Sequence, residues 1–362
     1  MNPYFAAAAL VLAGAFASGL RGADAPFVLG ADVSALDSPA PRASSWGALP
    51  PYQENGVPAD EVTILHRHGW NAFRIRVFVA PVRQAPANTV EAAIPLACEV
   101  KRLGATFLLD LHFSDTWADP QHQDIPVAWR GLDIDELARA WEAHAYETVK
   151  RLKEAGAMPD WVQIGNEITR GAAWPLAQVK QPGSAKFPPP EPYDDARQWD
   201  HLIRLIQAGI RGVKAAAGPQ SPRIAIHIDQ GASWAVTRWY FDHLEQAHVP
   251  YDIIAQSFYP EWNHGTIAEV EDNMRHCAAR YGKPFLIVET GYAASHVPNN
   301  TSLLWPVTPE GRLSYLEAIV TAVRKGPNGL GVMYWAPERQ MWNRAGTPGP
   351  GVDVLDRLNG AR

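Results

Sequence analysis

From residue 27 onward, short apolar runs alternate with longer segments whose apolar residues recur at helical spacing. Glycine, proline or polar residues bound each run, which is typical of strands buried on both faces of a parallel sheet. Strands are predicted at 27–34, 72–79, 106–112, 161–167, 223–229, 253–259, 285–289 and 331–335. The helical segments between them have recognisable starts, such as the capping box of Asp133 and Glu136 and the turn at 308–310.

Eight strand–helix units in one chain predict the α/β class and a single-domain (β/α)8 TIM barrel over residues 26–362. A doubly wound sheet is the alternative, but it would be expected to carry a glycine-rich phosphate loop after the first strand. Gly30-Ala31-Asp32 is not such a loop. The proline-rich segment 180–192 is predicted to be a long loop after strand 4, on the catalytic face of the barrel, and 344–351 is also predicted to be a loop.

Residues 1–25 have the pattern of a signal peptide. An apolar stretch from Phe5 to about Leu20 is followed by Ala23-Asp24-Ala25, a small-x-small cleavage pattern. The stretch is short and poor in bulky residues for a membrane span. We therefore expect cleavage and a secreted or periplasmic location, without membrane association of the mature chain.

Charge and cysteine usage narrow the set of partners. The net charge of −6 and the lack of lysine or arginine blocks in the sequence argue against nucleic acid or an anionic membrane. Cys98 and Cys277 fall on the predicted helices after strands 2 and 6, which lie too far apart across a barrel for a disulfide. We interpret both as small buried apolar residues and expect a monomer.

Two glutamates follow apolar runs where a barrel carries its catalytic groups. Glu167 ends predicted strand 4 and Glu289 ends predicted strand 7. Active sites of these barrels lie at the carboxyl ends of the strands, and a carboxylate after a buried run is costly unless it is paired or functional. One such glutamate is explained by a salt bridge to a neighbouring strand, whereas two on strands 4 and 7 favour catalysis.

A facing pair of carboxyl groups suits hydrolysis of a glycosidic bond. One group holds a proton for the leaving oxygen and the other attacks the anomeric carbon, and a separation of about 5–5.5 Å gives retention. Strands 4 and 7 are expected to face each other across a span of that size, so we predict a retaining mechanism with a covalent glycosyl-enzyme. Like charge and burial are expected to raise the pKa of the acid/base.

The chain resembles glycoside hydrolase family 53, the endo-β-1,4-galactanases, over most of its length after the signal segment. The strongest blocks are LDLHFSDTWADP at 109–120 and VQIGNEI at 162–168, with weaker matches at 71–79, 257–262, 287–290 and 332–335. The resemblance implies Glu167 as acid/base and Glu289 as nucleophile. It also implies endo-hydrolysis of a plant-type β-1,4-galactan or a related polysaccharide. The prediction of galactose specificity rests on this resemblance alone.

Some segments depart from the family pattern. The family often has a longer loop after strand 7, which carries calcium in some bacterial members. Here 291–306 is comparatively short and offers His296, Asn299 and Asn300 but no carboxylate, so no metal or other cofactor is expected. Ala336 follows Trp335 where the family usually has glutamate. We expect these changes to affect the outer subsites and not the chemistry.

Other residues are expected to support the glutamates. Asn166 is predicted to bond the sugar 2-hydroxyl, and Tyr259 to bond Glu289. Arg76 is preferred over Arg74 as the cation that keeps Glu289 ionised, because Arg76 lies closer to the strand end. For Arg74, a purely structural salt bridge is an equal alternative.

A His/Asp set raises a rival hypothesis. Asp110 and His112 share one face of strand 3, and His227 and Asp229 share one face of strand 5. A metal-dependent barrel hydrolase would use three or four such side chains as converging ligands. It would leave the two glutamates unexplained, so a hydrogen-bond network that orders the sugar and the glutamates is the favoured interpretation.

The sequence holds 14 tryptophans, and several are expected to stack on sugar rings. The candidates at strand ends and in top-face loops are Trp117, Trp129, Trp174, Trp262, Trp305, Trp335 and Trp342. Trp335 is preferred as the floor of the subsite for the cleaved sugar, and Asp115 in the strand 3 block is also expected to bind substrate. Trp141, Trp199 and Trp239 lie on predicted helices and are assigned to the core.

Alternative functions stay open. Hydrolysis of another β-glycan is the runner-up, because no residue pattern distinguishes axial from equatorial O4. A non-catalytic sugar-binding barrel would keep the tryptophans and lose a carboxylate, whereas both carboxylates are present. The spread of tryptophans over several loops favours an open cleft and endo action.

Overall fold

The computed structural model describes residues 27–360 apart from 38–42, 45–46, 49, 82–86, 180–195, 263–264, 294, 296–299 and 301. The predicted signal peptide at 1–25, the predicted loop at 180–192, and His296 and Asn299 therefore lie outside the described residues. Within the described residues, no helix combines the length and the apolar character that a bilayer crossing requires.

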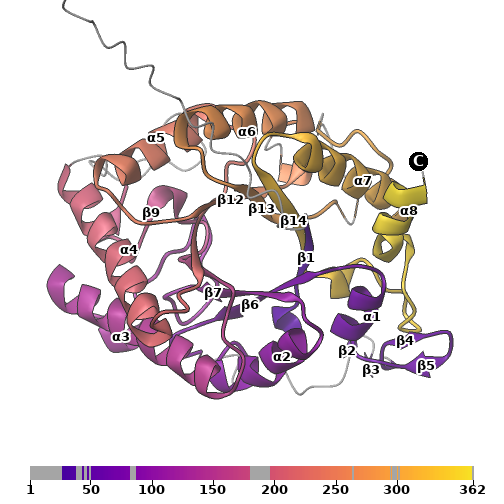
Figure 1. Ribbon diagram of the computed structural model, residues 1–362, viewed down its shortest axis with the longest axis horizontal. Helices are drawn as coiled ribbons and strands as arrows, with labels where there is room; N and C mark the ends of the chain where they lie inside the picture. Colours follow the sequence, from indigo (N-terminus) through magenta and orange to yellow (C-terminus); the bar gives the residue numbers. More distant parts are fainter. Residues whose placement is uncertain are drawn as a thin grey trace, which may run out of the picture.

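Eight parallel strands of the described residues form a closed barrel (Figure 1). They are β1 (Val28–Asp32), β6 (Ala72–Val77), β7 (Thr106–Leu111), β8 (Trp161–Ile164), β11 (Arg223–Ile228), β12 (Ile253–Phe258), β13 (Phe285–Thr290) and β14 (Gly329–Trp335). β1 pairs in parallel with both β6 and β14, which closes the sheet. The predicted TIM barrel is thus confirmed, and the doubly wound alternative was wrong because an open sheet has no such closure.

Helices surround the barrel as an outer ring (Figure 1). They are α1 (Glu61–Arg67), α2 (Val90–Arg102), α3 (Ile134–Glu154), α4 (Ala196–Ala217), α5 (Trp234–Gln246), α6 (Ile267–Tyr281), α7 (Pro309–Lys325) and α8 (Val354–Gly360). The predicted capping box is present in α3, where Asp133 accepts from the Glu136 amide and the Glu136 side chain accepts from the Asp133 amide. Both cysteines are free; Cys277 on α6 is buried, and Cys98 on α2 is half-buried.

Short elements lie outside the barrel strands and the ring of helices, and they were not predicted from the sequence. Two-residue strands form the hairpins β2 (Ala43–Ser44) with β3 (Gly47–Ala48), β4 (Gln53–Glu54) with β5 (Val57–Pro58), and β9 (Gly171–Ala172) with β10 (Ala177–Gln178). Single 3-10 turns are η1 (Ser34–Asp37), η2 (Val127–Trp129), η3 (Ile168–Arg170), η4 (Pro260–Trp262), η5 (Pro337–Arg339) and η6 (Pro350–Asp353). Several of these turns follow a barrel strand directly and shape the catalytic face.

The barrel interior is divided into an apolar and a polar layer. The apolar layer contains Val28, Ala72, Leu108, Trp161, Ala225, Ile253, Ala255, Leu286, Val288 and Met333. Because alternate strand residues face the same side, the residue two positions further along each strand also points inward. Those positions hold Arg74, Asp110, Gln163, His227 and Ser257, all buried. The interior is therefore polar in the carboxyl-terminal half of the barrel, where the site lies.

Candidate active site

The polar layer opens into a cavity of about 290 Å³. Its lining is Arg74, Arg76, His112, Trp117, Ala118, Asp119, Asn166, Glu167, Tyr259, Trp262, Glu289, Trp335 and Arg339. Both glutamates predicted from strands 4 and 7 therefore share one cavity, and each is about 6% exposed. This is the geometry required for two carboxyl groups to act on one bound molecule.

A tight turn presents Glu167 to the cavity. β8 ends at Ile164, three residues before the predicted strand end, because Gly165 turns the chain with φ of 78°. Glu167 itself has φ of 47° and ψ of 45°, a left-handed conformation that is uncommon for a residue with a side chain. Such backbone strain is typical of functional sites. The Glu167 Oε1 atom lies 2.6 Å from Ser257 Oγ.

A register irregularity presents Glu289. Val288 belongs to the apolar layer, so strict alternation would point Glu289 out of the barrel. The pairing of β13 with β14 shifts between Ile287 and Thr290, and Glu289 lines the cavity. Thr290 turns outward and bonds Tyr315 Oη at 2.5 Å. A bulge therefore re-aims the carboxylate, as bulges beside active sites often do.

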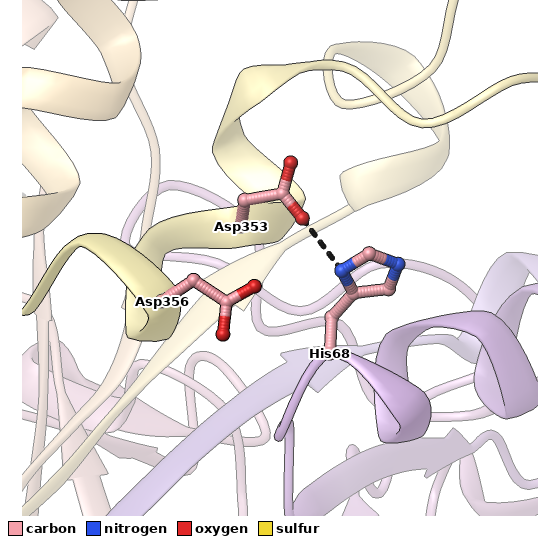
Figure 2. Close-up of side chains that lie close together, drawn as sticks. All are labelled: His68, Asp353 and Asp356. Atoms are coloured by element: carbon pink, nitrogen blue, oxygen red, sulfur yellow. Dashed lines mark ion pairs between the residues drawn. The ribbon is translucent and has the colours of Figure 1, made fainter. Parts of the chain in front are cut away.

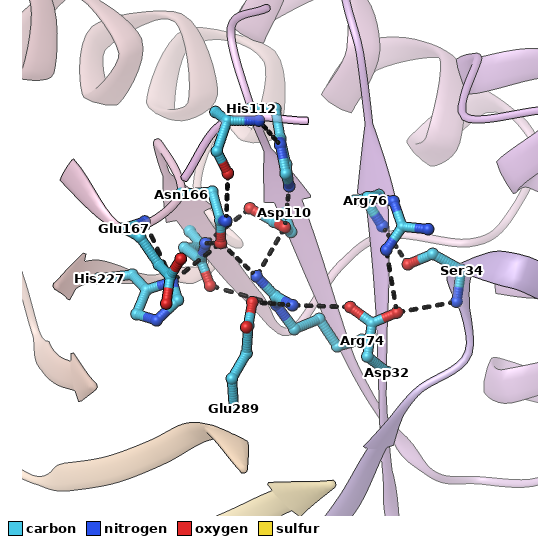
Figure 3. A network of polar contacts seen from close by, with 12 residues as sticks. Asp32, Ser34, Arg74, Arg76, Asp110, His112, Asn166, Glu167, His227 and Glu289 are labelled. Carbon is cyan, nitrogen blue, oxygen red and sulfur yellow. Dashed lines mark hydrogen bonds and ion pairs between the residues drawn. The ribbon is translucent and has the colours of Figure 1, made fainter. Parts of the chain in front are cut away.

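Arg74 connects the acidic groups of the site (Figure 3). Its guanidinium lies 2.6 Å from Asp32 Oδ2, 2.7 Å from Asp110 Oδ2 and 2.7 Å from Glu289 Oε1. It also donates to Asn166 Oδ1 at 2.7 Å. Burial would lower the pKa of Arg74, but Asp110, Glu289 and Asp32 more than offset it and raise the pKa. Arg74 is therefore a fixed positive charge between the two halves of the site.

The preference for Arg76 as the partner of Glu289 was wrong. Arg74 makes that contact, because the Glu289 carboxylate lies level with the deeper of the two strand 2 arginines. Arg76 donates from Nε to Asn88 Oδ1 at 2.8 Å and lies 3.8 Å above the Trp117 ring. It lines the cavity wall, where it stays a candidate for substrate binding.

The surroundings of the two glutamates differ. Burial, Glu289 and Asp229 raise the pKa of Glu167 well above its usual value. Burial also raises the pKa of Glu289, but Arg74 opposes that rise, and the Tyr259 hydroxyl donates to Glu289 Oε2 at 3.0 Å. The predicted Tyr259 contact is thus confirmed. The two environments therefore favour Glu167 over Glu289 as the holder of a shared proton.

The predicted network of polar side chains is present beneath the cavity. Asp110 accepts from Gln163 Nε2 at 2.6 Å and from His112 Nε2 at 2.9 Å. Burial lowers the pKa of His112, although Asp110 opposes this, and the Ala118 amide donates to His112 Nδ1 at 3.1 Å. A neutral His112 with its proton on Nε2 satisfies both contacts. His112 lines the cavity, whereas Asp110 lies below it.

Asp115 and Asp229 do not line the cavity, contrary to the prediction. Asp115 accepts from the backbone amides of Ala80 at 2.9 Å and Val127 at 2.8 Å, so both of its carboxylate oxygens hold loops together. Asp229 bonds the Thr169 hydroxyl and accepts from Gln230 Nε2 at 2.8 Å. It braces η3, the turn that follows Glu167, and its charge contributes to the raised pKa of Glu167.

Sequence reasoning missed several members of the site. Asp32, Gln163 and Ser257 lie in the network, and Asp119 and Arg339 line the cavity. A signal existed for the first three, because each interrupts an apolar strand with a polar residue that faces inward. Asp119 lies in a loop but within the 109–120 block of the family resemblance, whereas nothing comparable marks Arg339.

Three of the seven tryptophans proposed as sugar platforms line the cavity: Trp117, Trp262 and Trp335. Trp117 and Trp335 meet edge to face with ring centroids 6.0 Å apart, and Arg339 lies 4.7 Å above the Trp335 ring. Trp262 is 57% exposed at the rim. Of the tryptophans assigned to the core, Trp141 and Trp199 are buried and Trp239 is half-buried. The other four platform candidates, Trp129, Trp174, Trp305 and Trp342, are not among the lining residues.

The structure does not group the His/Asp set of the metal hypothesis. Among the described residues, the group that could hold a metal ion is His68, Asp353 and Asp356 (Figure 2). None of these belongs to the cavity lining. His68 Nδ1 lies 2.6 Å from Asp353 Oδ1 and Nε2 lies 2.7 Å from Glu54 Oε1, so carboxylates already occupy both ring nitrogens. We interpret His68 as a cross-link between chain segments.

Known proteins share this architecture and sequence. The model of the family described as Glycosyl hydrolase family 53 matches residues 28–354. An uncharacterised protein of the bgaB 5′ region of Niallia circulans is 36% identical over 334 residues, covering 88% of this chain and 86% of its own. An arabinogalactan endo-β-1,4-galactanase of Humicola insolens is 30% identical over 287 residues, covering 76% of this chain and 80% of its own.

Solved structures agree with the sequence matches. A structure from a study of two fungal β-1,4-galactanases superposes with a TM-score of 0.77 at 25% identity, covering 91% of this chain and 99% of its own. The GH53 catalytic domain of Ignisphaera aggregans gives a TM-score of 0.75 at 26% identity, covering 91% of this chain and 94% of its own. With a closed barrel, two glutamates in one cavity and a family match over nearly all described residues, the chain belongs to glycosyl hydrolase family 53 and is a glycoside hydrolase.

Proposed function

We propose that the protein is a retaining endo-β-1,4-galactanase in which Glu167 is the acid/base and Glu289 is the nucleophile. Relatives of the chain are named arabinogalactan endo-β-1,4-galactanase, which supports galactan as the substrate. The observation that carries the catalytic assignment is the unequal setting of two carboxyl groups in one cavity. Glu289 has a buried guanidinium at 2.7 Å, whereas Glu167 has none among its contacts in the described residues.

The proposed reaction has two steps. In the first, Glu289 attacks the anomeric carbon while Glu167 gives its proton to the glycosidic oxygen, so the sugar becomes bonded to Glu289. In the second, ionised Glu167 takes a proton from water, which displaces Glu289 and leaves the sugar with its original anomeric configuration. Arg74 and the Tyr259 hydroxyl orient Glu289 and hold it ionised for the attack. Trp117, Trp262 and Trp335 supply apolar faces for the galactose rings.

Substitution of each glutamate tests the proposal. Glu167→Gln and Glu289→Gln are each expected to lower kcat on β-1,4-galactan by at least about 10³-fold, while oligosaccharide affinity changes little, because the amide keeps the shape of the side chain. Glu261→Gln is the control, since Glu261 is a half-buried glutamate that also follows a barrel strand but does not line the cavity. Turnover near the unsubstituted rate in either cavity variant would refute the assignment.

The stereochemistry and the substrate need separate measurements. Proton NMR of the first products should show the β anomer before mutarotation, and an initial α product would refute retention. A panel of plant β-glycans with product sizing should give internal cleavage of galactan. Release of single sugars from chain ends, or a faster reaction on another β-glycan, would contradict the endo-galactanase proposal. Export with cleavage near Ala25 also belongs to the proposal, and the mass of the exported protein tests it.

A further inference from the structure

A chain of hydrogen bonds runs behind Glu167, away from the cavity. The Glu167 Oε1 atom lies 2.6 Å from Ser257 Oγ, and Ser257 Oγ lies 2.8 Å from His227 Nε2. The chain continues from His227 Nδ1 to Asn166 Oδ1 at 2.9 Å. Asn166, Glu167 and His227 are labelled in Figure 3. Each of the three contacts needs one proton between its two atoms, so the donor of each contact follows from the number of protons that the side chains carry.

The orientation of the Asn166 amide fixes one end of the chain. Arg74 Nη2 lies 2.7 Å from one amide atom, and the Ala118 carbonyl lies 2.7 Å from the other. Arginine can only donate and a carbonyl can only accept, so the first atom is Oδ1 and the second is Nδ2. Asn166 Oδ1 is therefore an acceptor, and the proton of the contact with His227 must lie on Nδ1.

His227 then has one proton and not two. The residue is fully buried, and no carboxylate is among its contacts in the described residues. Burial, Arg74 and His112 lower the pKa of His227 well below its usual value. The Glu167 amide N–H is also placed to donate to His227 Nδ1, at 3.4 Å, which is the longest contact of the ring. If Nδ1 were its acceptor, the lone pairs of Nδ1 and Asn166 Oδ1 would face each other at 2.9 Å. A neutral ring with its proton on Nδ1 leaves Nε2 as an acceptor.

We infer that the His227–Ser257 pair holds Glu167 as a carboxylic acid in the empty enzyme. Because Nε2 accepts, the single hydroxyl proton of Ser257 points to His227. The contact of 2.6 Å between Ser257 Oγ and Glu167 Oε1 then takes its proton from Glu167. Ser257 and His227 are thus positioning residues, and the proton of Glu167 lies on the inner oxygen. This inference rests on the proposed function, since it concerns the acid/base of that reaction.

The arrangement has a consequence for the reaction. In the empty site the acid proton faces Ser257, so a half-turn of the carboxyl group must bring it to the glycosidic oxygen. The charged groups that face Glu167 are Glu289, Asp229 and Asp119, all acidic, so they also favour the protonated form. Tyr259, whose pKa burial and Glu289 raise, stays neutral.

The sign of a pH shift tests the inference. In Ser257→Ala the protonated form of Glu167 loses its acceptor, so the pKa of Glu167 should fall. The basic limb of the kcat/KM profile on β-1,4-galactan should then move to lower pH by roughly half to one unit. A serine that donated to ionised Glu167 would give the opposite sign. A shift to higher pH, or an unchanged limb, would therefore overturn the inference. Ser257→Thr keeps the hydroxyl and should keep the limb in place.

Leaving-group dependence separates this role from a merely structural one. A dinitrophenyl β-galactobioside has a leaving group that departs without protonation, so its glycosylation step does not need the acid. Ser257→Ala should retain the unsubstituted glycosylation rate on this compound while its basic limb on galactan shifts. An equal loss on both substrates would show a distorted site and would contradict the inference.

A measurement on the unsubstituted protein removes any dependence on variant folding. Nitrogen-15 NMR of histidine-labelled protein reports which ring nitrogen carries the proton. The chain has 12 histidines, and comparison with His227→Gln identifies the signal. We expect a neutral ring protonated on Nδ1 throughout the active pH range, and a neutral ring protonated on Nε2 would refute the inference. Glu167→Gln activity judges the proposed function separately, because it is independent of the His227 tautomer.

Discussion

Arg74 shows how one residue can organise a whole site. It lies in the middle of a barrel strand, is 1% exposed, and bonds groups from β1, β7, β13 and the turn after β8. A guanidinium can do this because it offers five donors in a rigid plane and stays ionised when buried. The site therefore depends on Arg74 for geometry as well as for charge.

Arg74→Lys should separate these contributions. The ammonium keeps the charge but cannot reach all of these acceptors, so we expect kcat/KM to fall by at least about 100-fold. Arg74 lowers the pKa of Glu289, so weakening the contact raises that pKa, and the acidic limb of the kcat/KM profile should move to higher pH. Arg76→Lys is the matched control. An acidic limb that moves with Arg76→Lys and not with Arg74→Lys would reverse the assignment.

At the residue scale, the sequence predicted many of the side chains that belong to the site but few of the bonds between them. Glu167, Glu289 and Tyr259 follow from polar residues at the ends of buried strands. The choice between Arg74 and Arg76 could not be made from alternation, since both face inward. That choice depends on how deep the Glu289 carboxylate lies, which a backbone irregularity in another strand decides.

At the scale of elements, Glu167 and Glu289, the two proposed catalytic residues, both lie where a strand departs from regular geometry. β8 stops at Ile164 and the chain passes through Gly165 and Glu167 with positive φ, while β13 changes register before Glu289. Periodicity predicts regular strands and is silent on such departures. This is why predicted strand 4 ran three residues too far, although the position of every barrel strand was otherwise anticipated to within a few residues.

Gly165→Ala tests whether the turn after β8 is needed for activity. A Cβ at Gly165 would lie 2.7 Å from the Ile168 side chain, and φ is 78°. Gly156 has φ of 77° with no atom within 4 Å, so Gly156→Ala is a control with the same backbone cost. We expect each variant to lose about 1–2 kcal/mol of unfolding free energy in denaturant titrations. Only Gly165→Ala should also lose kcat, by about tenfold or more, because Asn166 and Glu167 shift.

The opposite pattern would count against this account. If Gly165→Ala kept full kcat while it lost stability like Gly156→Ala, the turn would be a structural feature alone. Circular dichroism of both variants, compared at a temperature well below their midpoints, ensures that a lower kcat does not reflect a smaller folded fraction.

At the scale of the whole molecule, the closed barrel was predictable and its additions were not. Eight repeated strand–helix units indicate closure, since the pattern of buried strands leaves no edge strand. The hairpin strands and the 3-10 turns are only two to four residues long, too short to show a period. The contacts that tie the C-terminal segment to the rest join residues nearly 300 positions apart, such as the Trp70 Nε1 donation to the Val352 carbonyl at 3.0 Å.

His68 provides a test of that attachment. It bonds Glu54 in the β4–β5 hairpin and Asp353 in η6, and Figure 2 shows the contact with Asp353. The Asp353 side chain is 48% exposed. His68 and Glu54 are also partly exposed, at 19% and 20%. Ion pairs open to solvent are worth little, so His68→Ala should cost about 1 kcal/mol or less of unfolding free energy and leave kcat unchanged. Thermal and denaturant unfolding with parallel activity assays would measure both. A loss of several kcal/mol, or a large fall in kcat, would show that the segment supports the catalytic face directly.

The separation of the barrel interior into an apolar layer and a polar layer has a further consequence. The glutamates and the side chains that bond them lie on the barrel strands or in the first residues after them. Trp117 and Trp262, which are proposed to stack on sugar rings, lie on connecting segments. Grafting such connecting segments from other members of the fold would replace the contacts that Trp117 and Trp262 make with the polymer, while Trp335 on β14 and the two glutamates stayed in place. New polysaccharide preferences are therefore accessible to this scaffold without rebuilding its chemistry.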